Sequence, residues 1–334
     1  MVNISPERLK EIDKGFNNKR IAVIGDLMID RYFWGRVSRI SPEAPVPVVE
    51  VEEESIRLGG AANVANNVAS LGGEPLIIGV VGNDVGAESL KRLVADRGFS
   101  TDGIIVDETR PTTMKTRVIA HNQHVVRVDR EQKRDIGNEI QKKIMDILVQ
   151  NINRIDAIIL EDYNKGVLTK ELIREIVMLA RRYGLFVNVD PKFNNFFEYK
   201  GVTVFKPNRK ETEEALGCRV NTMEDAEKAI REMLNRLEAE NVLLTLGEKG
   251  MMLVERKGGL SQVETKARHV ADVSGAGDTV IATLTMAMVA GASVKESATI
   301  ANYAGGIVCG EVGIVPIERA VLIKTILQDI NHKS

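Results

Sequence analysis

The sequence is poor in residues that mark several classes of protein. It contains only two cysteines, Cys218 and Cys309, whose separation fits neither a disulfide framework nor a metal-binding motif. Aromatic residues make up 4% of the chain. No apolar run approaches the roughly 20 residues that a membrane-spanning helix requires. These absences favour a globular protein from a reducing compartment.

An excess of charge of one sign is absent as well. The 45 basic residues nearly balance 47 acidic ones, which gives no global attraction for nucleic acid or for an anionic membrane. Residues 1–20 are charged throughout and lack the apolar core of a signal peptide. We therefore expect a cytoplasmic protein with no nucleic-acid or membrane partner, which binds any anion at a local site.

No Gly-Lys dipeptide occurs, which excludes a Walker-type phosphate loop. Residues 272–279 instead read Asp-Val-Ser-Gly-Ala-Gly-Asp-Thr and precede the apolar run 280–290. The glycines permit a sharp turn into a helix whose bare N-terminal amides suit a phosphate. Asp278 could accept the proton of a hydroxyl that attacks phosphorus. By itself the segment fits equally well an ordinary loop with Asp278 as helix cap.

Most of the remaining chain alternates between strand-like and helix-like runs. This alternation predicts a parallel sheet with helices on both faces, in one domain over residues 1–334. A short surface helix is expected at 5–17. The predicted strands are 21–25, 76–81, 157–160, 186–190, 202–205 and 242–246, and the predicted helices are 63–71, 87–97, 136–151, 170–183, 211–216 and 223–237.

Two segments, about 32–54 and 113–129, interrupt this alternation. Three prolines enforce an extended path in the first, and the second has strand-like runs on either side of a polar break. His121 and His124 in that break fit a hairpin turn better than a metal site. We predict a small separate sheet that acts as a lid and excludes water from reacting phosphates. Its exposed edges suggest a homodimer that pairs the lids.

Polar clusters follow the predicted strands. Parallel strands end at one edge of a sheet, where ligands of open α/β proteins gather, so these clusters should lie together. Asp26 comes first, and the later clusters begin at 161, 190, 206 and 245. Gly59 and Gly60 precede a predicted helix in which Asn63 offers an amide to hydroxyl groups. Each feature alone also fits a plain turn or a packing position.

Taken together, these residues resemble the ribokinase-like (PfkB) carbohydrate kinases. The matching motifs are Gly59-Gly60 with Asn63, Asn208-x-x-Glu211, Thr245-x-Gly247-x-x-Gly250 and the segment 272–278. The resemblance extends over nearly the whole chain. It implies an ATP-dependent carbohydrate kinase whose fold is a three-layer α/β/α sandwich around a mostly parallel sheet, with a small β-sheet lid.

Within that family, residues 30–49 and the loop 162–166 resemble the heptose 7-phosphate kinases of lipopolysaccharide precursor synthesis. The resemblance implies phosphorylation of the anomeric hydroxyl of D-glycero-D-manno-heptose 7-phosphate to the 1,7-bisphosphate. Many such kinases are fused to a nucleotidyltransferase with a His-x-Gly-His motif. That motif is absent here, so the stand-alone form is expected.

The resemblance also assigns roles position by position. Asp278 would be the catalytic base, and the amides of Gly275, Ala276 and Gly277 would form an anion hole. The nucleotide positions are Asn208, Arg209, Lys210, Glu211, Thr245, Gly247, Gly250 and Asn302, with Glu211 organising Mg²⁺ through water. The substrate positions are Asp26, Asp30, Gly59, Gly60, Asn63, Asp162, Lys165 and Lys192. Some relatives bind K⁺, for which Asp272 and the carbonyls of Ser274, Glu311 and Gly313 would be counterparts.

The substrate's own phosphate needs cations, and Lys165, Lys192, Arg117 and Arg127 are the candidates, although each could equally be a solvated surface charge. A helix N-terminus should keep Asp278 ionised at neutral pH, as a base requires.

Two alternatives remain at this point. One is a PfkB kinase for another acceptor, such as ribose, fructose, fructose 1-phosphate or a nucleoside. The other is a non-catalytic sugar-binding regulator on the same fold, which the intact Asp278, Asn208 and Glu211 argue against.

Overall fold

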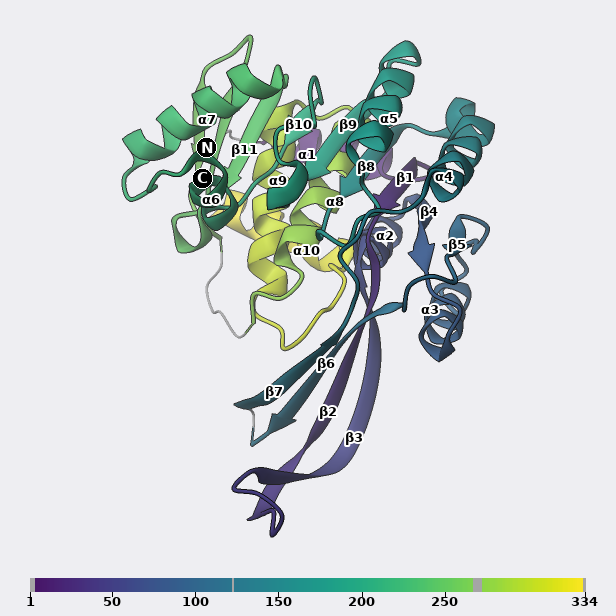
Figure 1. Ribbon diagram of the computed structural model, residues 1–334. Coiled ribbons are helices and arrows are strands. Elements are labelled where there is room, and N and C mark those ends of the chain that lie inside the picture. The colour runs from purple at the N-terminus through teal and green to yellow at the C-terminus, as the bar shows by residue number, and fades with distance from the viewer. Residues whose placement is uncertain (1–3, 122, 267–271, 333–334) are drawn as a thin grey trace.

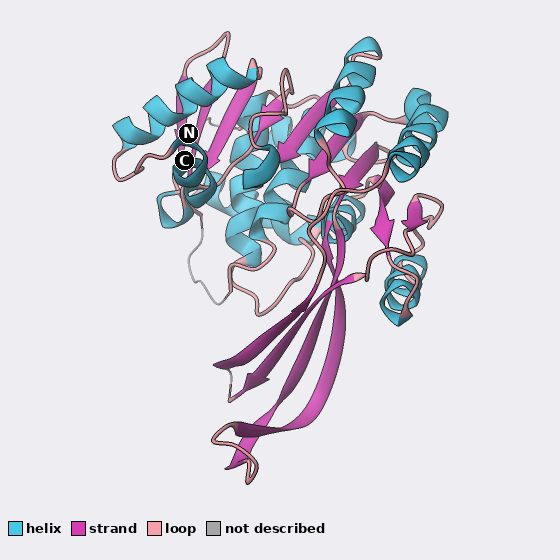
Figure 2. Ribbon diagram, in the orientation of Figure 1, coloured by secondary structure: helices cyan, strands magenta, loops and turns pink. Residues whose placement is uncertain are grey.

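A computed structural model describes residues 4–121, 123–266 and 272–332. Its body is built on a nine-stranded sheet in the order β13-β12-β11-β10-β9-β8-β1-β4-β5 (Figures 1 and 2). The pairings from β5 across to β11 are all parallel, and those of β12 and β13 are antiparallel. The predicted mostly parallel sheet is confirmed. Its strands are β1 (Arg20–Gly25), β4 (Glu74–Val81), β5 (Ile104–Val106), β8 (Ala157–Glu161), β9 (Phe186–Asp190), β10 (Val204–Phe205), β11 (Asn241–Thr245), β12 (Met251–Glu255) and β13 (Leu260–Val263).

Helices cover both faces of this sheet and complete the predicted three layers. Alternate residues of one strand enter different cores: Val23 joins one apolar cluster, whereas Ala22 and Ile24 join the other. The first cluster includes residues of α1 (Pro6–Gly15), α2 (Ala61–Ser70), α3 (Val85–Ala95), α8 (Ala276–Val289), α9 (Val294–Val308) and α10 (Arg319–Asn331). The second includes residues of α4 (Asn138–Asn151), α5 (Lys170–Arg182) and α7 (Met223–Leu237), and the short helix α6 (Arg209–Leu216) follows β10.

Helix α8 is the central helix of the first layer. Every residue from Asp278 to Met288 is buried, as the apolar run predicted. The helix begins directly after Gly275, which adopts a left-handed conformation with φ of 78°. An L side chain is strained there, so glycine allows the sharp entry into the helix. This turn brings Asp278 to the edge of the main sheet.

A second sheet projects from the body (Figure 1) and has the order β3-β2-β6-β7. Its strands are β2 (Leu27–Ile40), β3 (Pro47–Gly60), β6 (Thr113–Ala120) and β7 (Gln123–Arg130). The β6–β7 hairpin confirms the interpretation of the break at His121. The prediction for 32–54 was incomplete, because 14-residue strands occupy both sides of its turn and β2 already begins at Leu27. Asp30 therefore lies inside β2 rather than after the first strand.

Several elements were not predicted from the sequence, namely β5, β12, β13, α9 and α10. In the described part of the chain, no helix has the length and apolar composition needed to cross a bilayer.

Candidate active site

Three carboxylates meet at the predicted edge of the main sheet. Glu161 ends β8, Asp190 ends the neighbouring β9, and Asp278 lies in the first turn of α8. All three are buried, and one oxygen from each lies within 4.8 Å of the others. Sequence reasoning did not select Glu161 or Asp190 as site residues. The available signal was that each is an acid at the last position of a buried strand.

Asp278 is held by two hydrogen bonds, one to each carboxylate oxygen. The side-chain amide of Asn63 donates to Oδ2 at 2.7 Å, and the hydroxyl of Tyr163 donates to Oδ1 at 2.8 Å. Burial raises the pKa of Asp278 to about 6, and the Asn63 hydrogen bond opposes that rise. The carboxylate is thus mainly ionised at neutral pH, as expected, but its pKa lies above the ordinary value.

Tyr163 was not predicted as a site residue. It lies in the turn after β8, and its ring has the Lys115 ammonium 5.2 Å and the Lys192 ammonium 5.1 Å from its centroid. Burial and the charge of Asp278 raise the pKa of the phenol well above its ordinary value, so the hydroxyl keeps its proton. Its only sequence signal was its place in the loop 162–166.

Asp26 is engaged by the backbone of the loop that follows β8. Its carboxylate accepts backbone hydrogen bonds from Tyr163 at 2.7 Å, Lys165 at 3.0 Å and Val167 at 3.2 Å. These three bonds leave only about one of the roughly four acceptor positions of the carboxylate for a sugar hydroxyl. Asp26 thus fixes the turn that carries Tyr163, and its contact with the substrate stays a prediction.

Asp162 is likewise engaged within the protein. It accepts hydrogen bonds from the Tyr199 hydroxyl at 2.7 Å and from the amide of Asn164 at 2.7 Å. Burial raises the pKa of Asp162, whereas the Tyr199 bond lowers it. These hydrogen bonds shape the loop 162–166. The direct contact with the acceptor that the resemblance implies stays a prediction.

Of the other predicted substrate positions, Asn63 contacts Asp278, and Asp30, Gly59 and Gly60 lie on the strands that lead into the second sheet. Asp30 is buried in β2 and forms an ion pair with Arg117 of β6. Gly59 lies on the neighbouring strand opposite Met28, and a Cβ atom there would come within 2.1 Å of an Asp30 oxygen, so a larger residue would displace the Asp30 side chain. Gly60 has φ of 55° and joins β3 directly to α2, whose first turn presents Asn63 to Asp278.

The predicted nucleotide residues meet at a neighbouring point of the same edge. Asn208 and Glu211 form a capping box at the start of α6, with the Glu211 amide 2.9 Å from Asn208 Oδ1. An isolated β-bridge pairs Asn208 with Thr245, the last residue of the adjacent strand β11. Gly247 and Gly250 then turn with φ of 61° and 83°. The structure thus brings these predicted residues together.

The remaining predicted nucleotide positions do not contact Asn208, Glu211 or Thr245 through their side chains among the hydrogen bonds and ion pairs of the described residues. Arg209 and Lys210 are exposed on α6, and Arg209 pairs with Glu213 at 3.2 Å. Asn302 is buried on α9, where its side-chain amide donates to the Glu264 carbonyl at 2.7 Å. Its amide hydrogen-bonds the segment after β13.

The two lysines expected to bind substrate are both paired with acids. The Lys192 ammonium lies 2.5 Å from Glu211 and 3.7 Å from Asp190, and Lys165 lies 2.7 Å from Glu131. Their charges are therefore largely balanced by these carboxylates, and their contact with the substrate phosphate stays a prediction.

Asp272 closes a turn before α8. Its oxygens accept the amide of Ser274 at 2.9 Å and the amide of Gly313 at 3.0 Å. The two backbone segments named for the K⁺ site are thereby held next to each other.

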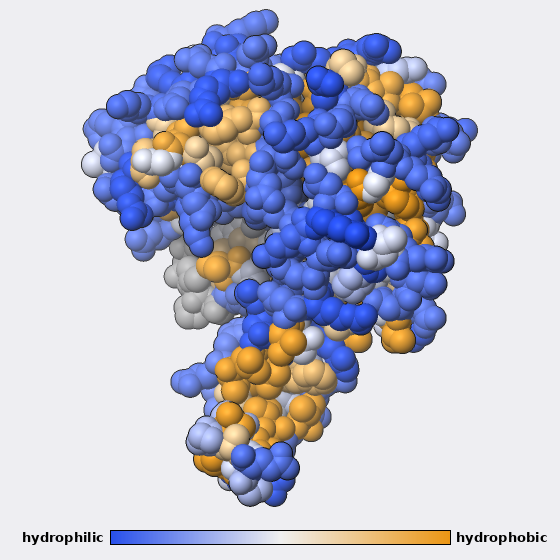
Figure 3. Space-filling view, in the orientation of Figure 1, coloured by the Kyte–Doolittle hydropathy of each residue, from blue (hydrophilic) through white to orange (hydrophobic). Residues whose placement is uncertain are grey.

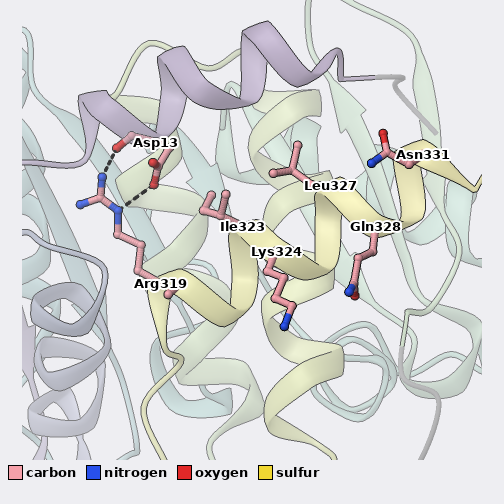
Figure 4. A pocket seen from close by; sticks show the side chains of 8 residues that line it. Asp13, Arg319, Ile323, Lys324, Leu327, Gln328 and Asn331 are labelled. Carbon is pink, nitrogen blue, oxygen red and sulfur yellow. Dashed lines mark hydrogen bonds and ion pairs between the residues drawn. The ribbon is translucent and has the colours of Figure 1, made fainter.

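A groove elsewhere on the molecule lies along α10 beside α1 (Figure 4). Arg319 forms one end of it and pairs with Asp13 at 2.7 Å. Ile323 and Leu327 form its apolar lining. None of the predicted site residues lines it, so it is separate from the edge described above.

Comparison with known proteins adds independent information. The family model described as pfkB family carbohydrate kinase matches residues 18–318. The chain is 43% identical to the bifunctional protein HldE of Desulfatibacillum aliphaticivorans over 314 residues, which cover 94% of this chain and 64% of that protein. It is also 43% identical to HldE of Helicobacter pylori strain J99 over 307 residues, covering 91% of this chain and 66% of that protein. The chain thus spans just under two thirds of these relatives.

Solved structures show the same fold at low sequence identity. Phosphofructokinase-2 from Escherichia coli in complex with potassium superposes with a TM-score of 0.76 at 19% identity, over 94% of this chain and 99% of that chain. Arabidopsis thaliana ribokinase complexed with ribose and ATP gives a TM-score of 0.73 at 19% identity, over 93% and 99%. The ribokinase-like architecture expected from the sequence is confirmed.

Proposed function

Because the chain belongs to the pfkB family of carbohydrate kinases, we propose that it transfers the γ-phosphoryl group of ATP to the anomeric hydroxyl of D-glycero-D-manno-heptose 7-phosphate. The product would be the 1,7-bisphosphate used in lipopolysaccharide precursor synthesis. The similarity to HldE proteins and the resemblance of residues 30–49 to heptose 7-phosphate kinases support this choice of acceptor. The observation that carries the proposal is the oriented carboxylate of Asp278 in the first turn of α8.

Asp278 is proposed as the general base. The anomeric hydroxyl gives its proton to the carboxylate while its oxygen forms a bond to the γ-phosphorus, and the bond from phosphorus to the ADP oxygen breaks. A pKa of about 6 leaves the carboxylate mostly ionised near neutral pH. It also makes the carboxylate a stronger proton acceptor than an aspartate with the ordinary pKa. The amides of Gly275, Ala276 and Gly277 would stabilise charge on the transferring group.

The acceptor is proposed to lie between Asp278 and the second sheet. Asn63 orients the base, and the adjoining Gly59 lets the Asp30 carboxylate pack against the backbone of β3, from where it would accept a sugar hydroxyl. Asp26 and Asp162 contribute indirectly, since their hydrogen bonds fix the loop that carries Tyr163. The second sheet would act as the lid that excludes water from the reacting phosphates.

The nucleotide is proposed to bind along Asn208 and the turn from Thr245 to Gly250, where unhindered backbone can approach phosphates. The donor set nearby suits Mg²⁺, which prefers carboxylate oxygens and water. Both Glu161 oxygens are buried without a hydrogen-bond partner among the described residues. Glu161 and Asp190 would hold the ion, with Glu211 acting through water, and when bound it supplies charge neutralisation for the phosphates. A K⁺ site at Asp272 is part of the proposal.

A homodimer through the second sheet is also proposed. Figure 3 shows apolar surface along this projecting sheet. Val126 and Val128 of β7 are 49% and 57% exposed, and Val51 of β3 is 52% exposed. Pairing with a second copy would cover this surface. Light scattering after gel filtration should give twice the mass of the chain, and Val128→Asp should lower it to the monomer mass. A monomeric wild type would refute the dimer.

The function is tested by incubating the protein with ATP, Mg²⁺ and heptose 7-phosphate and following the product by phosphorus NMR. A new anomeric phosphate signal is expected beside the retained 7-phosphate. Asp278→Asn, which keeps the shape of the side chain, should lower turnover by several orders of magnitude while ATP binding is nearly unchanged. Turnover by ribose, fructose or fructose 1-phosphate alone would contradict the proposed acceptor, and unchanged turnover in Asp278→Asn would remove it as the base.

A further inference from the structure

One face of the second sheet carries an array of charged side chains. The strand register places Arg57, Asp30, Lys115 and Asp129 opposite one another across the four strands, and Tyr32, Arg117 and Arg127 form the next matching row on that face. Successive residues of a strand point to opposite faces, so rows two residues apart share one face. The intervening row, which includes Val128, faces the other way. One face of the sheet is therefore rich in charged side chains, and the other carries apolar side chains together with the Arg31–Glu54 ion pair.

The charged face is directed toward the proposed catalytic base. The Lys115 ammonium lies 5.2 Å from the centre of the Tyr163 ring, and the hydroxyl of that ring donates to Asp278. A single aromatic side chain thus separates Lys115 from Asp278. An acceptor with its anomeric hydroxyl at Asp278 would extend along this face.

Most cations of this region already have acidic partners. Arg117 pairs with Asp30, and Arg127 pairs with Asp129 at 3.0 Å. All four cations selected from the sequence for the substrate phosphate are neutralised in this way, since Lys165 and Lys192 also form ion pairs. The charges that would attract an added anion must therefore come from other residues.

Lys115 is such a residue. It forms no ion pair with a carboxylate in the described ranges, and it is partly shielded from solvent. Burial lowers the pKa of its ammonium group from the ordinary value, although the nearby charges of Asp30, Asp129 and Glu131 oppose that fall. Arg57 adds a second positive charge in the same row, because it donates to the Ile314 carbonyl at 2.9 Å rather than to an acid.

We propose that Lys115, assisted by the charge of Arg57, binds the phosphate monoester that the acceptor already carries, so that this row of the sheet selects sugar phosphates over free sugars. Asp30 and Asp129 lie opposite Lys115 in the strand register without forming an ion pair with it. A phosphate dianion would supply that direct partner and would replace the lost hydration of the ammonium group with charge-assisted hydrogen bonds. The inference rests on the proposed function for the position of the acceptor.

The test compares Lys115→Met with wild type on heptose 7-phosphate and on the same heptose without its phosphate. The variant should raise KM for the phosphorylated acceptor at least about tenfold, equivalent to about 1.4 kcal/mol, and leave KM for ATP and for the free sugar unchanged. Arg36→Met is the matched control, because that cation lies on β2 of the same sheet but is 62% exposed and paired with Glu50 and Glu52. It should change neither acceptor by more than about twofold.

An unchanged KM ratio in Lys115→Met, or equal losses for both acceptors, would overturn the inference. Calorimetric titration with heptose 7-phosphate in the absence of ATP gives the same comparison independently of turnover. If wild type instead phosphorylates another sugar phosphate, the proposal that heptose 7-phosphate is the acceptor fails. The role of Lys115 is then tested by comparing Lys115→Met with wild type on that other sugar phosphate and on its unphosphorylated form. A wild-type preference for an unphosphorylated sugar would overturn the selection proposed for Lys115.

Discussion

Tyr163→Phe removes one hydrogen bond from the proposed base while keeping the aromatic ring between its neighbours. The lost group is the hydroxyl that donates to Asp278 Oδ1 at 2.8 Å. The Asn63 hydrogen bond to the other oxygen remains. The variant therefore changes the acidity of Asp278 with little change in shape.

The direction and size of the effect follow from this contact. A donated hydrogen bond favours the ionised carboxylate, so its loss raises the pKa of Asp278 from its present value of about 6. Hydrogen bonds to charged groups contribute about 1.5–3 kcal/mol, and one pH unit corresponds to about 1.4 kcal/mol. Because Asn63 still supports the charge, we expect a rise of about one unit. The ionised fraction at pH 6 then falls about fivefold, whereas at pH 8.5 it is nearly unchanged.

The assay is the pH dependence of kcat/KM for the acceptor at saturating ATP, since this quantity reports the ionisation of the free enzyme with respect to the acceptor. The acidic limb should move to higher pH by about one unit in Tyr163→Phe. Tyr199→Phe is the matched control, because its hydroxyl donates to Asp162 instead of Asp278. An acidic limb that stays in place, or a loss of equal size at every pH, would refute the link between Tyr163 and the charge of Asp278.

Two further variants test the buried charges around the site. Asp26→Asn leaves one of three backbone amides without its acceptor, so the free energy of unfolding should fall by about 2 kcal/mol. The value of kcat/KM should fall as well, because the loop that carries Tyr163 loses part of its support. Denaturant unfolding that matches wild type would contradict this expectation. Lys206→Met removes the ammonium 2.8 Å from Asp190 and should lower stability by about 3 kcal/mol, with partial recovery when Asp190→Asn is added. Absence of that recovery in thermal melts would show that the ion pair is not the cause.

Local sequence patterns were sufficient for much of the fold. The helix that begins at residue 276 and the strand that ends at Asp190 were both predicted, because apolar runs and glycine turns act over a few residues. The first half of β2 was missed, since the strand follows β1 after one residue and this half also pairs in parallel with the distant β6, in addition to its hairpin pairing with β3. Such pairing joins residues more than 80 positions apart and leaves no local pattern.

The site shows the same division. Asp278 and Asn63 were identified through motifs, and they meet in the structure although 215 positions separate them. The partners of the charged residues were not predictable, because the acid that neutralises Lys192 depends on how β9 and α6 approach each other. The backbone partners of Asp26 were not predictable for the same reason, because they depend on how the loop after β8 approaches the end of β1. Its sequence position indicated the correct edge of the sheet but not the backbone amides that occupy it.

The direct join between β3 and α2 would couple the proposed closure of the second sheet to the orientation of the base. Gly60 ends the strand and Ala61 begins the helix, so a swing of the sheet would change the backbone torsions at this junction. Asn63 lies three residues beyond it and steers Asp278. An open sheet would turn the first helical turn away and leave the carboxylate misaligned, whereas closure over a sugar would realign it. Wasteful cleavage of ATP by water would thereby be suppressed until an acceptor is in place.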